Sequence, residues 1–303
     1  MMMTQNKNIL VFGEVLFDDF GERGKVLGGA PFNVAWHLKG FGYEPLFVSR
    51  IGHDKSGEEV RRRMTDWGMS LAGLQTDSTY PTGLVSIDIV GNEPKFNILP
   101  DQAYDHIKIS GKENFLENFP YKIIYHGTLA LRNKTSHISL KRIIQKTDNK
   151  IFLDVNLREP WWQIDQLFEI ISGVSWLKCN REEFKLIIEH ADISSDNTEK
   201  AAWSLCNKFK LDLILITKGS EGAMIVNNTG KVWSGQPEPI NQISDTVGAG
   251  DGFSAVTLIG ILLDWDLNTL LKRAIHFASQ ICGIRGATIN DPEFYDKQSK
   301  KWI

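Results

Sequence analysis

The residues with the most specific chemistry lie in a glycine-rich segment at 245–254. It reads Asp-Thr-Val-Gly-Ala-Gly-Asp-Gly-Phe-Ser and leads into an apolar run over Ala255–Leu263. We predict that this run is a buried helix. The backbone N–H groups of Ala249, Gly250 and Asp251 at its start would form an anion-binding cradle, strengthened by the helix dipole. Glycines in the cradle would let a phosphate approach the backbone closely.

Asp251 is unexpected in such a cradle, because a carboxylate there would repel an anion. Beside a phosphate that is being transferred, the carboxylate would accept the proton of an attacking hydroxyl. The alternative is that Asp251 only caps the helix, and the local residues leave both interpretations open. The segment is neither a Walker P-loop nor a dinucleotide fingerprint, because no GxxxxGK[ST] occurs and the glycine spacing differs.

Two motifs near the N-terminus carry residues suited to a polyol. Asp18 follows a first apolar run, and ligands of open α/β sheets bind beyond the carboxyl ends of the strands. Its carboxylate is either an acceptor for sugar hydroxyls or an exposed loop acid. Gly28 and Gly29 then open a predicted helix with Pro31 in its first turn. Asn33 in the same turn offers both a donor and an acceptor.

Short apolar runs alternate with amphipathic segments along most of the chain. Such runs are typical of parallel strands that are covered on both faces. The alternation predicts an α/β fold with a doubly wound, mostly parallel sheet. The predicted strands are Ile9–Phe12, Leu46–Ile51, Ile123–His126, Ile151–Val155, Trp176–Cys179 and Leu213–Thr217. The predicted helices are Asn33–Lys39, Gly57–Trp67, Ser136–Thr147, Arg181–Glu189, Glu199–Phe209, Gly250–Leu263 and Asn268–Gly283.

One region has a different pattern. Apolar and polar residues alternate over Leu84–Val90 and again around Phe96 and Ile98. Alternation indicates a sheet with one wet face, so we predict a hairpin whose strands are joined near 91–94. This small sheet is either a lid over a site or an ordinary edge hairpin, and the periodicity does not separate the two.

The composition excludes several classes of protein. The 303 residues are 42% hydrophobic and 23% charged, with a formal net charge of −3, which argues against nucleic-acid binding. No run approaches the roughly 18 apolar residues of a membrane span, and none resembles a signal peptide. The three cysteines form no CxxC and are expected to be reduced thiols. We expect a soluble cytoplasmic protein with no membrane or nucleic-acid partner.

Taken together, the motifs resemble those of the ribokinase (PfkB-type) family of carbohydrate kinases, and most closely those of fructokinases. Residues 28–35 with Gly42 resemble the first family signature, and residues 245–253 resemble the second, which is highly specific. The elements Asn180-x-x-Glu183 and Thr217–Gly222 also have counterparts in the family. The resemblance implies one ribokinase-like domain over 1–303, with lid strands inserted at about 14–28 and 84–100.

The resemblance also implies roles, residue by residue. Asp251 would be the general base, and Gly248, Ala249 and Gly250 the anion hole for the γ-phosphate of ATP. The sugar-binding residues would be Asp18, Gly28, Gly29, Asn33, Phe96 and Arg158. The nucleotide-binding residues would be Asn180, Glu183, Thr217, Gly219, Gly222 and Ser279. Glu183 would hold Mg²⁺ through water, and Asp245 with the carbonyl of Val247 would bind a monovalent cation, usually K⁺.

The subtype is indicated by two short stretches. The run Gly-Gly-Ala-Pro-Phe-Asn at 28–33 is similar to the fructokinase form of the first motif. The DxNxR segment from Asp154 to Arg158 resembles one shared by fructokinases and 2-keto-3-deoxygluconate kinases, in which the arginine reaches the active site. An arginine just past a strand end can bind a carboxylate or phosphate bidentately, or form a salt bridge with Glu159 or Asp154. Trp161 and Trp162 depart from the common form.

The predicted function is ATP-dependent phosphorylation of a primary hydroxyl of a small sugar, with fructose first and Asp251 as general base. The alternatives are 2-keto-3-deoxygluconate kinase or ribokinase-type activity, and a non-catalytic sugar-binding homologue. An NAD-dependent oxidoreductase has only the α/β pattern in its favour. Lid-to-lid homodimers occur in the family, but Ser86 and Asp88 on the wet face indicate no apolar interface, so a homodimer stays open.

Overall fold

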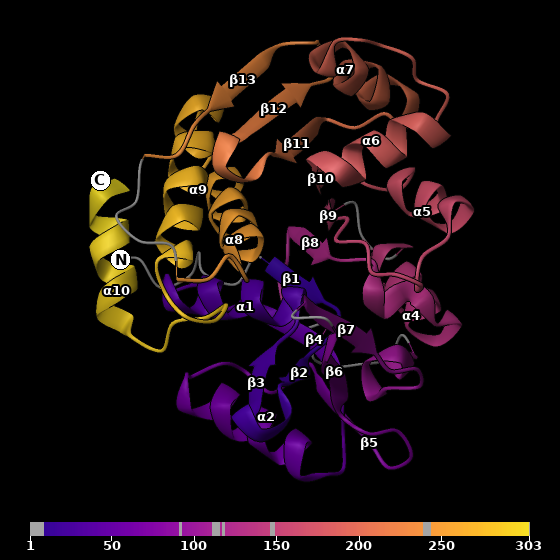
Figure 1. Cartoon of the computed structure of the whole chain (residues 1–303), viewed down its shortest axis with the longest axis vertical. Helices are drawn as coiled ribbons and strands as arrows, with labels where there is room; N and C mark the ends of the chain where they lie inside the picture. The colour runs from indigo at the N-terminus through magenta and orange to yellow at the C-terminus, as the bar shows by residue number, and fades with distance from the viewer. Residues whose placement is uncertain are drawn as a thin grey trace. The chain divides into compact units, whose positions relative to one another are not determined.

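The computed structural model describes residues 9–90, 93–110, 116, 119–145, 149–238 and 244–302, without the side chains of 23 and 87–96. The chain divides into two compact units, and Figure 1 labels the helices and strands that they contain. The first unit is 1–122, 130–149 and 288–295, and the second is 123–129, 150–287 and 296–303. None of the helices in the described ranges is long and apolar enough to cross a bilayer.

The first unit contains a parallel part of the sheet and two covering helices. The strands β1 (Ile9–Phe12), β4 (Leu46–Gly52) and β5 (Leu74–Asp77) pair in that order and run parallel. All residues of β1 are buried, as expected for a strand that is covered on both faces. The helices that follow β3 and β4 are α1 (Ala30–Gly40) and α2 (Lys55–Asp66).

A separate four-stranded sheet belongs to the same unit. Its order is β3-β2-β6-β7, with β2 (Leu16–Asp19), β3 (Lys25–Gly28), β6 (Gly83–Val90) and β7 (Glu93–Ile98). The strands β6 and β7 are antiparallel, which confirms the predicted hairpin, and β2 pairs with β6 in parallel. The predicted small sheet outside the main one is therefore present.

The second unit has six strands in the order β13-β12-β11-β10-β9-β8. The four from β8 to β11 are parallel and near-continuously apolar, whereas β12 and β13 are antiparallel additions at one edge. The bounds are β8 (Ile123–His126), β9 (Lys150–Asp154), β10 (Trp176–Asn180), β11 (Leu213–Thr217), β12 (Ala223–Asn227) and β13 (Val232–Gly235).

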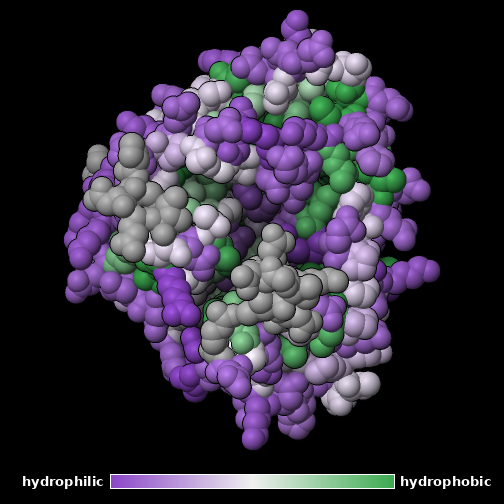
Figure 2. Space-filling view, in the orientation of Figure 1, coloured by the Kyte–Doolittle hydropathy of each residue, from purple (hydrophilic) through white to green (hydrophobic). Residues whose placement is uncertain are grey.

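Helices cover both faces of this part of the main sheet. In Figure 1 α8 (Ala249–Leu262) and α9 (Leu267–Cys282) lie on one side of the strands. The other side carries α5 (Ile164–Ile171), α6 (Arg181–His190) and α7 (Thr198–Phe209). This is the doubly wound arrangement, so the predicted fold class is confirmed. Figure 2 shows that the described surface in this view is mostly hydrophilic, with small separate hydrophobic areas.

The remaining helices are α4 (Lys134–Gln145) and α10 (Pro292–Ser299), with short 3-10 turns at 21–23, 103–106, 129–132, 219–221 and 300–302. We made no prediction for the polar tail that contains α10. Tyr295 of α10 is fully buried, and its hydroxyl lies 2.9 Å from His37 Nδ1 in α1. This contact holds α10 against α1. A Cβ on Gly40 would lie 2.6 Å from the ring, so α1 needs a glycine at this contact.

The six strands predicted from apolar runs are all present, within one or two residues at each end. Three further strands of the main sheet, β5, β12 and β13, were not predicted. β5 reads Leu-Gln-Thr-Asp and β13 reads Val-Trp-Ser-Gly, so neither has the continuous apolar run that marks a strand covered on both faces.

Candidate active site

Helix α8 begins at a glycine that the structure requires. Gly248 is the N-cap residue, with φ 81° and ψ −7° in the left-handed region. A Cβ at this position would lie 2.5 Å from both the Cα and the Cβ of Ala287. The N–H of Gly252 donates to the carbonyl O of Gly248 at 2.9 Å and closes the first turn. The N–H groups of Gly250 and Asp251 therefore lie at the helix end, a position that favours anions, while the N–H of Ala249 lies 3.4 Å from the carbonyl O of Thr246.

Asp251 occupies the third position of α8 and is half-buried. A capping side chain normally belongs to the N-cap residue, which here is Gly248. Beyond the first turn the helix is buried continuously over Gly252–Gly260, and Asp251 is its only charged residue. The carboxylate thus belongs to the same helical turn as the N–H groups of the predicted cradle.

A buried ion pair lies against the start of α8. Lys178 Nζ donates to Asp154 Oδ2 at 2.7 Å, and the two side chains are 6% and 5% exposed. A Cβ on Gly250 would lie 3.5 Å from Lys178 Nζ. The same Asp154 oxygen accepts from Ser254 Oγ at 2.8 Å and from the Tyr125 hydroxyl at 3.3 Å. One carboxylate oxygen therefore links β8, β9, β10 and α8.

The charge of Lys178 is held by its neighbours. Burial acts to lower the pKa of Lys178, but the charge and hydrogen bond of Asp154, with the charges of Asp251 and Glu183, raise it above its usual value. Lys178 is therefore a permanent positive charge among three carboxylates. No motif in the sequence predicted a role for Lys178. A lysine inside the apolar run Trp176–Cys179 was the signal that could have found it, because a buried charge needs a partner.

Asn180 and Glu183 form a capping box at the start of α6. The Asn180 side chain accepts from the N–H of Glu183, and Glu183 Oε2 accepts from the N–H of Asn180, both at 2.8 Å. Glu183 Oε1 accepts from the N–H of Leu157 at 2.8 Å. The spacing Asn-x-x-Glu is also typical of a capping box, so these residues have a structural role beside the predicted one.

The environment of Glu183 fits a metal that is held through water. Its carboxylate is 9% exposed, and burial is the largest of the causes that raise its pKa. Both oxygens already accept one backbone N–H, and each keeps a second lone pair. Mg²⁺ usually keeps several of its waters in proteins, so a carboxylate of this kind can order those waters.

The loop after β9 carries Arg158 at the surface. Asn156 has φ 42°, which turns the chain away from the strand. Arg158 is exposed, and its Nη1 donates to the carbonyl O of Leu157 at 3.1 Å. Glu159 accepts instead from Trp162 Nε1 at 2.9 Å. Among the residues the structure describes, neither Glu159 nor Asp154 forms an ion pair with Arg158, so the salt-bridge alternative is not supported.

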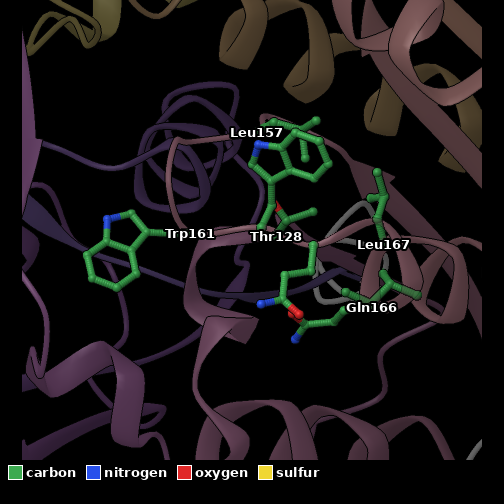
Figure 3. A pocket seen from close by; sticks show the side chains of 8 residues that line it. Thr128, Leu157, Trp161, Gln166 and Leu167 are labelled. Carbon is green, nitrogen blue, oxygen red and sulfur yellow. The ribbon is translucent and has the colours of Figure 1, made fainter. Parts of the chain in front are cut away.

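A pocket lies beside this loop. Its lining residues are Thr128, Leu157, Trp161, Trp162, Gln163, Gln166, Leu167 and Ile170. In Figure 3 the Trp161 ring points away from Gln166 and Leu167. Thr128 Oγ1 donates to the carbonyl O of Val155 at 2.7 Å, which holds the pocket wall to the end of β9. Trp161 and Trp162, which depart from the fructokinase pattern, therefore line this pocket. They follow Arg158 in the sequence by three and four residues.

Three of the predicted nucleotide-binding residues lie in one turn between β11 and β12. Thr217 is the last residue of β11, and the N–H of Lys218 donates to the carbonyl O of Gly222 at 2.7 Å. Gly219 and Gly222 have φ 58° and 86°. A Cβ on Gly222 would lie 2.0 Å from the carbonyl O of Gly235, so this position needs a glycine.

Ser279 lies in the last turns of α9, and its hydroxyl donates to the carbonyl O of Ile275 at 3.0 Å. A second pocket lies along the earlier part of the same helix. Lys272, His276 and Lys301 are among its lining residues, and Lys301 Nζ lies 3.4 Å from His276 Nε2. Ser279 is not among the residues that line this pocket. Its predicted place near the adenine stays a prediction.

The predicted cation site joins the segment before α8 to the segment after α9. Asp245 Oδ1 accepts from the N–H of Val247 at 3.0 Å, and Oδ2 accepts from the N–H of Gly286 at 3.4 Å. Within the described ranges, no group of three or more His, Cys, Asp or Glu side chains could hold a metal ion. The monovalent cation therefore stays a prediction that depends on carbonyl oxygens.

The predicted sugar-binding residues of the first unit lie together. A Cβ on Gly28 would lie 3.6 Å from Asp18 Oδ2 and 3.9 Å from Asn33 Oδ1. Gly29 has φ 107°, and a Cβ there would lie 2.8 Å from the carbonyl O of Glu14. Asn33 is 4% exposed and Glu14 is 2% exposed. The buried carboxylate of Glu14 received no role from the sequence, although it lies only four residues before Asp18.

Phe96 pairs with Ile87 across β6 and β7. Its side chain lies outside the described part of the structure. The prediction that it faces the sugar is therefore not tested.

Comparison with known proteins gives one family and several relatives. A family model described as "pfkB family carbohydrate kinase" matches residues 7–293. A fructokinase of Escherichia coli is 26% identical over 92% of this chain and 93% of its own. A 5-dehydro-2-deoxygluconokinase of Clostridium botulinum is 24% identical over 91% of this chain and 86% of its own.

Among solved structures, the sugar kinase PH1459 from Pyrococcus horikoshii superposes with a TM-score of 0.80. It is 27% identical and covers 97% of this chain and 98% of its own. Its complex with ATP matches with a TM-score of 0.76 and 25% identity, over 97% of this chain and 100% of that chain. The fold is ribokinase-like, with the mostly parallel sheet and the separate lid sheet described above. The chain belongs to the pfkB family of carbohydrate kinases and is an ATP-dependent phosphotransferase.

Proposed function

We propose that this kinase phosphorylates a primary hydroxyl of a small sugar, with fructose as the first candidate and Asp251 as general base. The observation that carries the proposal is the position of Asp251 in the first turn of α8, three residues after the left-handed Gly248. The position combines a proton acceptor with the backbone N–H groups that bind an anion.

In the proposed reaction, the acceptor hydroxyl gives its proton to the Asp251 carboxylate while its oxygen attacks the γ-phosphorus of ATP. A bond forms between that oxygen and phosphorus, the bond to the β,γ-bridging oxygen breaks, and ADP leaves. The N–H groups at Gly248–Gly250 stabilise the charge on the transferring group. The proton on Asp251 then passes to solvent.

Supporting residues would bind and orient the two substrates. Asp18 and Asn33, whose oxygens both lie near Gly28, fit hydrogen bonding to sugar hydroxyls. The turn with Gly219 and Gly222 fits the nucleotide, because its glycines allow a close approach to the backbone. Mg²⁺, when bound with ATP through water near Glu183, would neutralise phosphate charge during transfer.

An acidic sugar is the second candidate, and Arg158 favours it. Its guanidinium is exposed and has no ion-pair partner among the described residues, so it is available to a substrate carboxylate. The 2-keto-3-deoxygluconate kinases share the DxNxR segment, and a relative of this chain is a 5-dehydro-2-deoxygluconokinase. A neutral ketohexose has no carboxylate. With such a substrate, Arg158 would contact a phosphate or would take no part in binding.

The test is a coupled assay of ADP release with ATP and Mg²⁺ over fructose, 2-keto-3-deoxygluconate, ribose, glucose and nucleosides, with and without K⁺. We expect sugar-dependent ADP release with the highest kcat/KM for fructose. The Arg158→Gln variant separates the two candidates, because an acidic substrate would lose about 10-fold or more in kcat/KM through its lost charged hydrogen bonds. Absence of ADP release with every sugar in the panel would contradict the proposal.

A further inference from the structure

Asp154 has a structural position that its role as the first residue of the DxNxR segment does not explain. It ends β9, is 3% exposed, and directs a single oxygen, Oδ2, at three donors. These donors are Lys178 Nζ at 2.7 Å, Ser254 Oγ at 2.8 Å and the Tyr125 hydroxyl at 3.3 Å. A buried carboxylate must be paired, and here each of the three donors belongs to a different element from β9.

The bond from Ser254 reaches the helix that carries the proposed base. Ser254 lies in α8 one turn after Gly250, is fully buried, and its Oγ is also 3.0 Å from the carbonyl O of Gly250. Asp154 therefore holds α8 to β9 at the point where its first turn ends.

The bond from Lys178 brings a positive charge to the same turn. Its ammonium lies 3.5 Å from the position of a Cβ on Gly250, so glycine at 250 leaves the space open between the charge and the helix backbone. Within the described residues the ammonium makes one hydrogen bond, to Asp154, although it has three N–H groups. Its charge offsets carboxylates that would otherwise repel an incoming phosphate.

We propose that Asp154 is a positioning residue for phosphoryl transfer. Through Ser254 it fixes the first turn of α8, and through Lys178 it holds a positive charge against Gly250. This inference rests on the proposed function, since the first turn of α8 has kinetic consequences only if it is the site of transfer. A displacement of reacting groups by about 1 Å can cost about 100-fold in rate, so a fixed first turn matters.

The experiment compares Ser254→Ala with the matched control Ser136→Ala. Ser136 is also a fully buried serine in a helix, and its Oγ also lies within hydrogen-bond distance of two groups: it donates to the carbonyl O of Tyr104 and accepts from the N–H of Ile107. We expect kcat to fall about 10-fold in Ser254→Ala with the KM for sugar unchanged, and neither value to move in Ser136→Ala. Ser254→Thr, which retains the hydroxyl, is expected to recover part of the lost kcat.

Amide hydrogen exchange gives a second readout that does not depend on turnover. Exchange at 252–255, where the N–H groups are bonded within the helix, is expected to accelerate in Ser254→Ala, while exchange in β12 stays as in the wild type. Wild-type kcat in Ser254→Ala, or unchanged exchange at 252–255, would overturn the inference. If the wild-type protein turns over none of the sugars, the proposed function fails by itself. The exchange at 252–255 then decides the positioning role alone.

Discussion

The two most buried ion pairs described in the molecule have the same charge and burial but different geometry. In the first unit, Arg132 binds both oxygens of Asp105 at 2.7 Å, and the side chains are 6% and 2% exposed. In the second unit, Lys178 binds one oxygen of Asp154, and the side chains are 6% and 5% exposed. The first pair satisfies its own charges, whereas the second leaves an ammonium beside the start of α8.

The remaining partners follow the same division. Arg132 Nη2 also donates to the carbonyl O of Leu99, and Asp105 Oδ2 accepts from the N–H of Gln102. This pair therefore fixes the loop segment from 99 to 105. The partners of Asp154 come from other strands and from α8. A bidentate arginine is suited to a structural lock, and a lysine is a compact charge that can act on a neighbour. Burial alone therefore does not identify a functional ion pair.

Breaking the structural pair is expected to have the largest effect on stability. Arg132→Met leaves the Asp105 carboxylate buried and unpaired, which costs about 3–5 kcal/mol in the free energy of unfolding. Chemical denaturation measures this loss, and kcat per folded molecule should equal the wild-type value. The double variant Arg132→Met/Asp105→Asn should recover much of the loss. A loss below about 1 kcal/mol would show that the pair is not a structural lock.

A methyl group at the start of α8 tests the other region. In Gly248→Ala the new Cβ would lie 2.5 Å from Ala287, and the residue would have to keep a φ of 81°. We therefore expect the free energy of unfolding to fall by about 2–3 kcal/mol and kcat to fall strongly. Gly42→Ala is the matched control, because Gly42 has φ 82° and no atom within 4 Å of its Cβ position. The free energy of unfolding of this control should fall by only about 1 kcal/mol, and its kcat should equal the wild-type value. Equal effects in thermal unfolding and turnover would contradict the steric account.

An exposed ion pair is expected to have the smallest effect on stability. Glu59 on α2 binds Arg62 and Arg63, and these hydrogen bonds lower the pKa of Glu59 to about 2. Because its pKa is lowered, the Glu59 carboxylate stabilises the fold at pH values above the ordinary pKa of a glutamate. This contribution is lost as the pH falls through about 2. Glu59→Gln should cost about 0.5 kcal/mol at pH 7, because water and salt screen an exposed pair. A difference of several kcal/mol, or one independent of pH, would refute this.

Local pattern was sufficient for the parallel strands and for the glycine-rich helix start. The continuous apolar runs of β1, β8 and β11 are visible in the sequence, because both faces of each strand are covered. The glycines at 28 and 29 were also visible, and the need for Gly29 is explained by its φ of 107° and by its close approach to the carbonyl O of Glu14.

The network around Asp154 was not predictable in the same way. Ser254 is 100 residues from Asp154 and Lys178 is 24 residues away, so no local spacing joins them. The same holds for Tyr295, which is 258 residues from His37. Such pairs are set by the order of strands in the sheet. The lysine inside an apolar strand was the single local sign that a partner had to exist.

The general base is the central claim, and Asp251→Asn tests it most directly. The matched control is Asp266→Asn, since Asp266 caps α9 through the N–H groups of Asn268 and Thr269 and lies at a helix start without a glycine cradle. We measure sugar-dependent ADP release and, separately, sugar binding by calorimetry. The account predicts that Asp251→Asn binds sugar normally while its kcat falls by about 100- to 10,000-fold, and that Asp266→Asn keeps full kcat. A wild-type kcat in Asp251→Asn would contradict the account.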